Sequence, residues 1–244
     1  MTVYGAAPAA TEAMTEEPDR VLAVYAHPDD PEMSCGGTLA RWAEAGAEVR
    51  LVIVNAGDKG SPHAETDPAE LTRRRAAEVD AAAAVLGLAG VERLGLPDGE
   101  VTNDVELRGR LVALLRTHRP DVVVAPDPTA VYFGDSYVNH RDHREVGWAV
   151  LDAVAPAAAS PLYFPAAGPP HQVRIMLLSG TLEPDVGVDI SSVVDKKVKA
   201  VQCHESRVGG DPALVGRLIR ARTAEAGAPL GVPHAEAFRR LRFG

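Results

Sequence analysis

Short apolar runs alternate along the chain with longer amphipathic stretches. The runs have the length and the β-branched composition of buried strands, and they lie at 21–24, 49–54, 91–96, 121–126, 172–178 and 186–190. The amphipathic stretches predict helices at 38–48, 68–86, 105–118, 193–205 and 212–226. A further helix is predicted to follow 139–144 and to continue through 159. Strands that alternate with helices are joined as right-handed βαβ units, so the pattern predicts an α/β fold with a mostly parallel sheet.

Length and composition fit one domain of this kind. The chain has 244 residues, of which 46% are hydrophobic, and this is enough for one sizeable core. Residues 1–18 are rich in Ala, Thr and Glu and lack the basic and apolar parts of a signal peptide. We therefore expect a flexible N-terminal tail over 1–18 and a single domain over 19–244.

The charge balance limits the partners of the protein. The 25 basic and 34 acidic residues give a net charge of −9, which argues against nucleic acid or an anionic membrane as the main partner and favours a small molecule. No run approaches the roughly 20 apolar residues of a membrane span. Cys35 and Cys203 form neither a disulfide framework nor a thiolate zinc motif. We expect a cytoplasmic protein with reduced thiols.

Ionisable side chains gather directly after the first and the fourth apolar runs. They are His27, Asp29 and Asp30 after the first run, and His140, Asp142 and His143 after the fourth. The carboxyl ends of parallel strands meet at one edge of a sheet, so we expect the two groups to lie together. Two imidazoles and one carboxylate are a zinc set that leaves a position for water. We predict His27, Asp30 and His143 as ligands of Zn²⁺, although Fe²⁺ or Co²⁺ would accept the same donors.

The other three side chains would carry the chemistry. Successive side chains of an extended loop point in opposite directions, so Asp29 can act as the general base on the metal's water while Asp30 binds the metal. His140 would share a face with His143 in the first turn of a helix. An imidazolium there would stabilise an oxyanion or protonate a leaving amine. Asp142 would orient a histidine.

Other chemistries lack their motifs. No GxGxxG follows the first strand, and neither GxxxxGK[ST] nor GxSxG occurs, so dinucleotide binding, P-loop chemistry and an α/β-hydrolase serine find no support. The long loop at 127–141 carries Tyr132, Phe133 and Tyr137. Loops of that length inside a compact domain are more often functional than idle.

The two polar groups resemble the motifs of the LmbE-like, or PIG-L, family of zinc-dependent N-acetylglucosaminyl deacetylases. The family's AHPDDE with a following glycine pair is matched by AHPDD at 26–30 and CGG at 35–37, and its HxDH motif by 140–143. Secondary matches are Arg75, Glu78, Pro97, Asp98, Lys197, His204 and Ser206, so the likeness spans about 19–207. The resemblance implies a Rossmann-like three-layer sandwich that hydrolyses an acetamide, usually on a glucosamine unit.

The resemblance also implies roles for single residues. By motif match it gives the same three metal ligands, Asp29 as base and His140 as the electrophilic partner. Arg75 and Asp98 match positions that in relatives contact the sugar or shape the pocket, and Tyr137 would be an oxyanion donor. The implied partner is a small amino-sugar substrate. Because relatives often form closed oligomers, a homo-oligomer is also implied.

Three positions depart from the family pattern. Pro31 stands where the opening motif has Glu, with Glu32 one place later. Val138 stands where some relatives have the tyrosine before HxDH, and Arg207 replaces the Gln of a C-terminal HxSQ pattern. These departures bear on metal affinity and on substrate contacts.

The core motifs leave the substrate open. An amidase of glucosaminyl-inositol thiol conjugates and a tailoring deacetylase of a secondary metabolite share them with a simple N-acetylglucosamine deacetylase, and only the loops at 58–67 and 127–138 could discriminate. A catalytically silent sugar- or metal-binding protein is a further alternative. The intact Asp29 and His140 argue against it, since a silent protein has no need of both.

Overall fold

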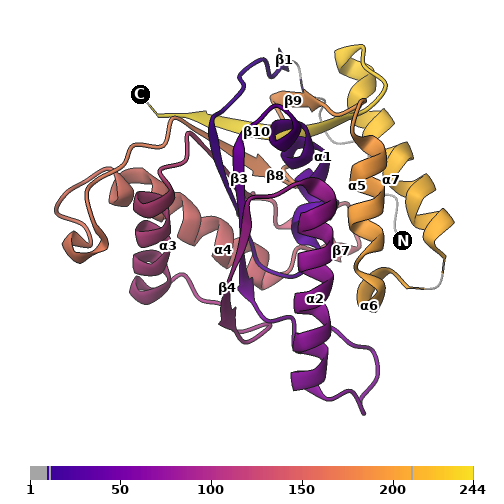
Figure 1. The fold of residues 1–244 in the computed structure, drawn as a ribbon, viewed down its shortest axis with the longest axis horizontal. Coiled ribbons are helices and arrows are strands. Elements are labelled where there is room, and N and C mark those ends of the chain that lie inside the picture. The colour runs from indigo at the N-terminus through magenta and orange to yellow at the C-terminus, as the bar shows by residue number, and fades with distance from the viewer. Residues whose placement is uncertain (1–9, 11, 210, 244) are drawn as a thin grey trace.

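The computed structural model describes residues 10, 12–209 and 211–243, and a twisted sheet runs through its centre (Figure 1). The sheet has eight strands in the order β1-β9-β10-β8-β5-β2-β3-β4. They are β1 (Glu12–Ala13), β2 (Arg20–Tyr25), β3 (Glu48–Asn55), β4 (Gly90–Leu96), β5 (Val122–Pro126), β8 (Ile175–Ser179), β9 (Val186–Asp189) and β10 (Ala235–Arg242). Strand β10 is antiparallel to both of its neighbours, and the other pairs are parallel. The predicted α/β fold with a mostly parallel sheet is confirmed.

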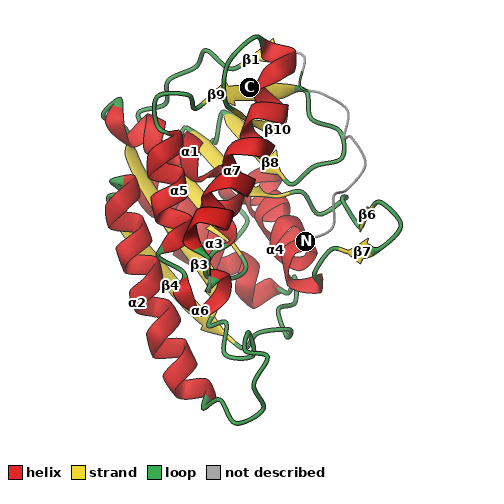
Figure 2. Ribbon diagram, turned by 90° about the vertical axis from the view of Figure 1, so that its right-hand side faces the viewer, coloured by secondary structure: helices red, strands yellow, loops and turns green. Residues whose placement is uncertain are grey.

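Helices cover both faces of the sheet, as Figure 2 shows. One face carries α1 (Asp30–Glu44), α2 (Pro68–Leu86), α5 (Val194–Gln202), α6 (Glu205–Val208) and α7 (Pro212–Gly227), and the other carries α3 (Val105–His118) and α4 (Arg141–Asp152). Alternate residues of β2 feed the two resulting cores: Val21, Ala23 and Tyr25 pack into one, and Leu22 and Val24 into the other. Burial on both faces explains why this strand is apolar without interruption.

Two helices have the bounds that the sequence predicts, because their ends are fixed by local chemistry. The Asp67 side chain accepts a hydrogen bond from the amide of Ala69, and Gly87 ends α2 in the left-handed region at φ 76°. At α3 the Asp104 side chain caps the amide of Leu107. These are ordinary signals of helix ends.

Helix α1 begins at Asp30, well before the predicted start at residue 38. Pro31 lies in the first turn, where its missing N–H is no loss. Gly37 lies inside the helix, where a Cβ would come within 2.6 Å of the Ile190 Cδ1 atom. Gly37 is therefore a close-packing position inside the helix, and the prediction that the glycine pair precedes the helix is wrong.

A buried ion pair also contacts the middle of α1. The Lys197 Nζ atom lies 2.6 Å from Glu236 Oε1 and donates to the carbonyl of Glu32 at 2.8 Å. The Glu236 carboxylate accepts the amides of Gly37 and Thr38 at 2.9 and 2.7 Å. This network ties the helix that follows β2 to the last strand of the chain.

Strand β10 has no counterpart in the predicted elements. Its sequence is highly charged, but Arg240 and Arg242 are paired with acidic side chains of the N-terminal segment, so the strand can lie inside the sheet. That segment also differs from the flexible tail expected over 1–18. Glu12–Ala13 pairs with β9 and Met14 is buried, whereas residues 1–9 and 11 lie outside the described residues.

The segment between β5 and α4 contains a small hairpin of β6 (Tyr132–Phe133) and β7 (Tyr137–Val138). Beyond α4, the predicted helix through 159 is interrupted at Ala155, whose φ of −136° and ψ of 114° are not helical, directly before Pro156. In the part of the chain that the structure describes, no helix is long and apolar enough to cross a membrane.

Candidate active site

The predicted functional groups meet at the carboxyl ends of the central strands. His27 follows β2, Asn55 ends β3, Asp98 follows β4, and His143 lies in the first turn of α4. Parallel neighbours in the order β5-β2-β3-β4 bring these four segments to one edge of the sheet. Ligands of open α/β sheets bind at this edge.

Three donor atoms form a nearly equilateral triangle. His27 Nδ1 lies 3.1 Å from Asp30 Oδ2 and 3.1 Å from His143 Nε2, and His143 Nε2 lies 3.1 Å from Asp30 Oδ2. Zinc bonds of about 2.0–2.1 Å in tetrahedral geometry place neighbouring donors about 3.3 Å apart. The two imidazoles and the carboxylate therefore fit a divalent cation, and they are the three side chains predicted from the sequence.

Neighbouring polar groups hold the two imidazoles in this orientation. The other ring nitrogen of His27, Nε2, lies 3.1 Å from Asp98 Oδ1 and 3.6 Å from Asp142 Oδ2. His143 Nδ1 lies 2.9 Å from Asn139 Oδ1. Such outward hydrogen bonds leave the lone pairs of His27 Nδ1 and His143 Nε2 for a metal.

The carboxylates around His27 give the site an excess of negative charge. Burial lowers the pKa of His27, but the charge of Asp30 and hydrogen bonds to Asp142, Asp30 and Asp98 outweigh it and raise the pKa to about 12. A positive charge at this point offsets the negative charge of the carboxylates. Either a proton on His27 or a divalent cation between the three donors supplies that charge.

Asp29 lies beside this triangle as the residue that precedes α1. Its backbone is left-handed, with φ 92°, so its carboxylate diverges from that of Asp30 through this turn and not through the extended loop expected from the sequence. Oδ1 accepts a hydrogen bond from Arg75 Nη2 at 2.9 Å, and Oδ2 lies 3.6 Å from Arg207 Nε. Burial and the charge of Asp30 raise the pKa of Asp29.

His140 precedes α4 and faces the same site. Its Nδ1 accepts a hydrogen bond from the amide of Asp142 at 3.2 Å, so the neutral ring carries its proton on Nε2. Burial and the charge of His27 lower the pKa of His140. The ring is therefore a neutral N–H donor, in contrast to the imidazolium expected from the sequence. Its centroid lies 4.6 Å from that of His27.

Known proteins share this arrangement of strands and motifs. The family described as "PIG-L: GlcNAc-PI de-N-acetylase" matches residues 22–154, which is more than half of the chain. The chain belongs to the PIG-L family. The family prediction made from the two motifs is thereby confirmed.

Individual relatives agree with this assignment. Diacetylchitobiose deacetylase of Thermococcus kodakarensis is 32% identical over 79% of this chain and 71% of its own length. A 1D-myo-inositol 2-acetamido-2-deoxy-α-D-glucopyranoside deacetylase of Saccharopolyspora erythraea is 31% identical over 78% of this chain and 84% of its own. The structure of N,N′-diacetylchitobiose deacetylase from Pyrococcus horikoshii superposes with a TM-score of 0.83 at 28% identity, covering 93% of this chain and 85% of that one.

The three residues assigned to substrate by the PIG-L resemblance lie in different surroundings. Asp98 contacts His27 and is buried, and Arg75 is only 4% exposed and donates three hydrogen bonds to protein oxygens. Tyr137 lies on the β6–β7 hairpin, 40% exposed, with its ring 6.0 Å from that of Phe133.

Several residues that shape this PIG-L site are not among those predicted from the sequence. Asn55 donates to Asp142 Oδ2 at 3.0 Å, and Asn139 Oδ1 lies 2.9 Å from His143 Nδ1. The positions of these asparagines, one at the end of a predicted strand and one directly before the HxDH motif, could have indicated a role in the site. Glu32 turns into the interior, where its Oε2 atom lies 3.1 Å from His204 Nε2. The displaced motif glutamate thus supports the C-terminal motif and not the three donor atoms.

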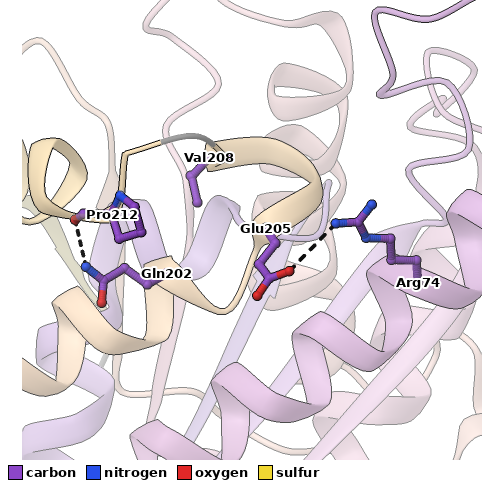
Figure 3. Close-up of a pocket in the computed structure, with 6 residues that line it drawn as sticks. Arg74, Gln202, Glu205, Val208 and Pro212 are labelled. Atoms are coloured by element: carbon purple, nitrogen blue, oxygen red, sulfur yellow. Dashed lines mark hydrogen bonds and ion pairs between the residues drawn. The ribbon is translucent and has the colours of Figure 1, made fainter.

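A separate cavity of about 400 Å³ lies between α2, α5, α6 and the start of α7 (Figure 3). Arg74 and Glu205 face each other across it at 3.9 Å, and Gln202 donates to the carbonyl of Pro212 at 2.8 Å. None of the three donor residues lines this cavity, so it is distinct from the candidate active site.

Proposed function

We propose that this protein is a metal-dependent hydrolase that removes the acetyl group from a small molecule containing N-acetylglucosamine. The observation that carries the proposal is the 3.1 Å triangle of His27, Asp30 and His143 beside Asp29 in a chain of the PIG-L family. Two relatives are named for the deacetylation of diacetylchitobiose and of a glucosaminyl-inositol. Both substrates present an acetamide on a glucosamine ring.

His27, Asp30 and His143 would hold the cation, with Zn²⁺ as the proposed metal and Fe²⁺ or Co²⁺ as metals that the same donors accept. When bound, such a cation polarises a carbonyl and lowers the pKa of water towards about 7. Asp98 and Asp142 keep the His27 ring in place through its Nε2 atom. Asn139 does the same for His143.

Asp29 takes the proton of the attacking water in this mechanism. Its raised pKa makes it a stronger base than an exposed aspartate, and the left-handed turn directs its carboxylate away from Asp30. The Nε2–H group of His140 donates to the acetamide oxygen and stabilises the tetrahedral oxyanion. Asp29 then returns the proton to the nitrogen of the leaving amine.

The test combines metal analysis with acetate release. Purified protein would be assayed for bound metal and incubated with N-acetylglucosamine, diacetylchitobiose and an N-acetylglucosaminyl-inositol. We expect about one metal per chain and acetate release from at least one of the three. Bound metal without acetate release from any of them would refute the proposed substrate class, and a chain that binds no metal would refute the mechanism.

A further inference from the structure

Arg207 is an exposed arginine at the edge of the candidate active site. It lies on α6, and its Nε atom is 3.6 Å from Oδ2 of Asp29, the proposed base. Its side chain is 64% exposed, whereas that of Arg75, the other arginine at this carboxylate, is 5% exposed. Glu205 and Val208 of the same helix line the separate cavity of Figure 3, and Arg207 does not. Arg207 therefore belongs to the candidate active site and lies on the solvent side of Asp29.

The guanidinium of Arg207 has donors that the protein does not use. Within residues 10, 12–209 and 211–243, Asp29 is its only ion-pair partner, and its side chain makes no hydrogen bond. The 3.6 Å contact is longer than a hydrogen bond and involves Nε alone. Lys59 and Arg141, two other cations near the site, donate instead to the segment that follows β4. The two terminal nitrogens of Arg207 are therefore free to bind a ligand.

The backbone that carries Arg207 is fixed to α2. The amide and the hydroxyl of Ser206 donate to the two carboxylate oxygens of Glu78 at 2.8 and 2.5 Å, and Glu78 is buried. The amide of Arg207 donates to the carbonyl of His204 at 2.9 Å. Hydrogen bonds to a carboxylate are among the strong ones. Binding of a ligand then has to order the side chain of Arg207 alone, which keeps the entropic cost small.

The charges inside the site indicate which kind of ligand needs an arginine here. Four carboxylates lie within it, those of Asp29, Asp30, Asp98 and Asp142. They repel an anionic group that is brought to this edge of the sheet, and Arg207 is an exposed charge of the opposite sign beside them. A guanidinium also matches the paired oxygens of a carboxylate or phosphate, and such bonds are about twice as strong as those between neutral groups. This position therefore favours an oxyanion over a sugar hydroxyl.

The position of Arg207 also limits where on the substrate the anion is attached. In the proposed mechanism Asp29 acts on the acetamide, which stands on C2 of the glucosamine ring. The carbons next to C2 are C1 and C3, whereas C6 lies on the other side of the ring. A side chain beside Asp29 therefore meets the substituents of C1 and C3 first.

We propose that Arg207 determines specificity by binding a carboxylate or phosphate attached at C1 or C3 of the acetylated glucosamine. The substrate class is thereby narrowed to anionic derivatives of N-acetylglucosamine. This inference rests on the proposed function, because it takes Asp29 to act on the acetamide. Arg207 stands where the HxSQ pattern has an uncharged Gln, so Arg207→Gln restores that pattern and removes the charge.

The kinetic test compares acetate release from N-acetylglucosamine 1-phosphate, with its anion at C1, and N-acetylmuramic acid, with its carboxylate at C3. The neutral reference is a methyl glycoside of N-acetylglucosamine, and N-acetylglucosamine 6-phosphate carries the same kind of charge at the wrong carbon. For one of the first two, kcat/KM of the wild type should exceed that for the neutral reference by about 10-fold. Arg207→Gln should lose most of this ratio, and the ratio is unaffected by a general loss of turnover.

Arg217→Gln is the matched control, because the Arg217 side chain is 67% exposed and has one ion pair of 3.9 Å, with Asp211. It should keep the wild-type ratio. The ratio of the wild type should also fall as salt is added, since salt screens exposed charges, whereas that of Arg207→Gln should stay flat. A wild type without a preference for the anion, a preference that survives in Arg207→Gln, or an equal preference for the 6-phosphate would each overturn the proposal.

Binding of compounds that carry no acetyl group tests the inference without turnover. Titration calorimetry would compare glucosamine 1-phosphate, muramic acid and a neutral methyl glucosaminide on metal-loaded wild type and Arg207→Gln. We expect the preference for one anion over the neutral compound to shrink about 10-fold in the variant. Equal preferences in the two proteins would overturn the role of Arg207. A wild type that releases no acetate from any compound would refute the proposed function alone, since the calorimetric comparison would still decide whether Arg207 binds the anion.

Discussion

Two buried arginines, Arg75 and Arg116, lie on opposite faces of the sheet and have nearly the same exposure, 4% and 3%. Arg75 contacts the turn of the proposed base. Arg116, on α3, donates to six backbone carbonyls of the irregular segment 157–168. Among the described residues, no carboxylate lies within ion-pair distance of Arg116.

A buried arginine can stabilise irregular backbone by donating to its carbonyls, as Arg116 does, or it can pair with a carboxylate of a functional site, as Arg75 does. The segment at 157–168 makes few hydrogen bonds of the kind that a helix or strand provides, so its carbonyls need another donor, and Arg116 supplies several at once. Arg75 donates to only two backbone carbonyls, and it also pairs with a carboxylate, that of Asp29, at the functional edge of the sheet. Changes near Arg116 should therefore affect stability, and changes around Asp29 and the three donor residues should affect turnover.

The largest effect should follow loss of a donor at the functional edge. His143→Ala removes one corner of the triangle, so the variant should lose most of its bound metal and its acetate release should fall below detection, while the fold is retained. Metal analysis, circular dichroism and the acetate assay measure the three quantities. A variant with one metal per chain and normal turnover would remove His143 from the ligand set.

The next effect should come from the base itself. Asp29→Asn keeps the shape of the side chain, the acceptor for Arg75 and a tolerance for the left-handed turn, but it cannot take a proton. We expect kcat to fall by about 10²–10⁴-fold with metal content and thermal midpoint close to wild type. Full activity in this variant would exclude Asp29 as the base.

The opposite pattern should follow replacement of Arg116. Arg116→Met fills a similar volume but leaves several buried carbonyls without a donor, so the free energy of unfolding should fall by about 3 kcal/mol. Turnover per folded molecule should stay within about twofold of wild type. Urea unfolding and the acetate assay measure both, with Arg119→Met as the control because Arg119 is exposed and makes one bond of 3.4 Å to Pro170. A large loss of turnover in folded Arg116→Met would remove the contrast with Arg75.

The smallest expected effect is on the pH dependence of stability, and it concerns His171, which follows the segment that Arg116 contacts. His171 is buried beside Pro120, with its Nε2 atom 2.8 Å from that carbonyl, and burial lowers its pKa. Because the pKa is lower in the folded state than the value of about 6.5 in the unfolded chain, its stabilising contribution is complete above that value and is lost as the pH falls through the folded pKa.

We therefore expect the free energy of unfolding to decline less between pH 8 and pH 5 in His171→Gln than in wild type. Urea unfolding at both pH values measures the two declines. Equal declines would show that His171 does not contribute to the acid sensitivity of the fold.

The sequence predicts the elements whose ends are locally encoded. Helices α2 and α3 have their predicted bounds because Asp67, Gly87 and Asp104 act on neighbouring backbone groups. Helix α1 and strand β10 have no such signals: a proline and two glycines lie in the first half of the helix, and arginines crowd the strand. Both elements are stabilised by tertiary contacts, which override local propensity.

The same limit applies to the candidate site. Its donor residues lie in two short motifs, so residue type and spacing were enough to group His27 and Asp30 with His143. The contact of Arg75 with Asp29 spans 46 positions and depends on how α2 packs against the loop after β3. The spacing of residues along the sequence does not predict a contact of that kind.

The ion pair between Lys197 and Glu236 has a consequence for the order in which the protein matures. Ribosomes deliver the chain from its N-terminus, so Asp30 and its helix emerge early. The amides of Gly37 and Thr38 find their acceptor only when Glu236 has been synthesised. A nascent chain therefore carries α1 without this acceptor for its Gly37 and Thr38 amides until Glu236 has been synthesised, so the packing of this helix is completed by a residue about 200 positions further along the chain.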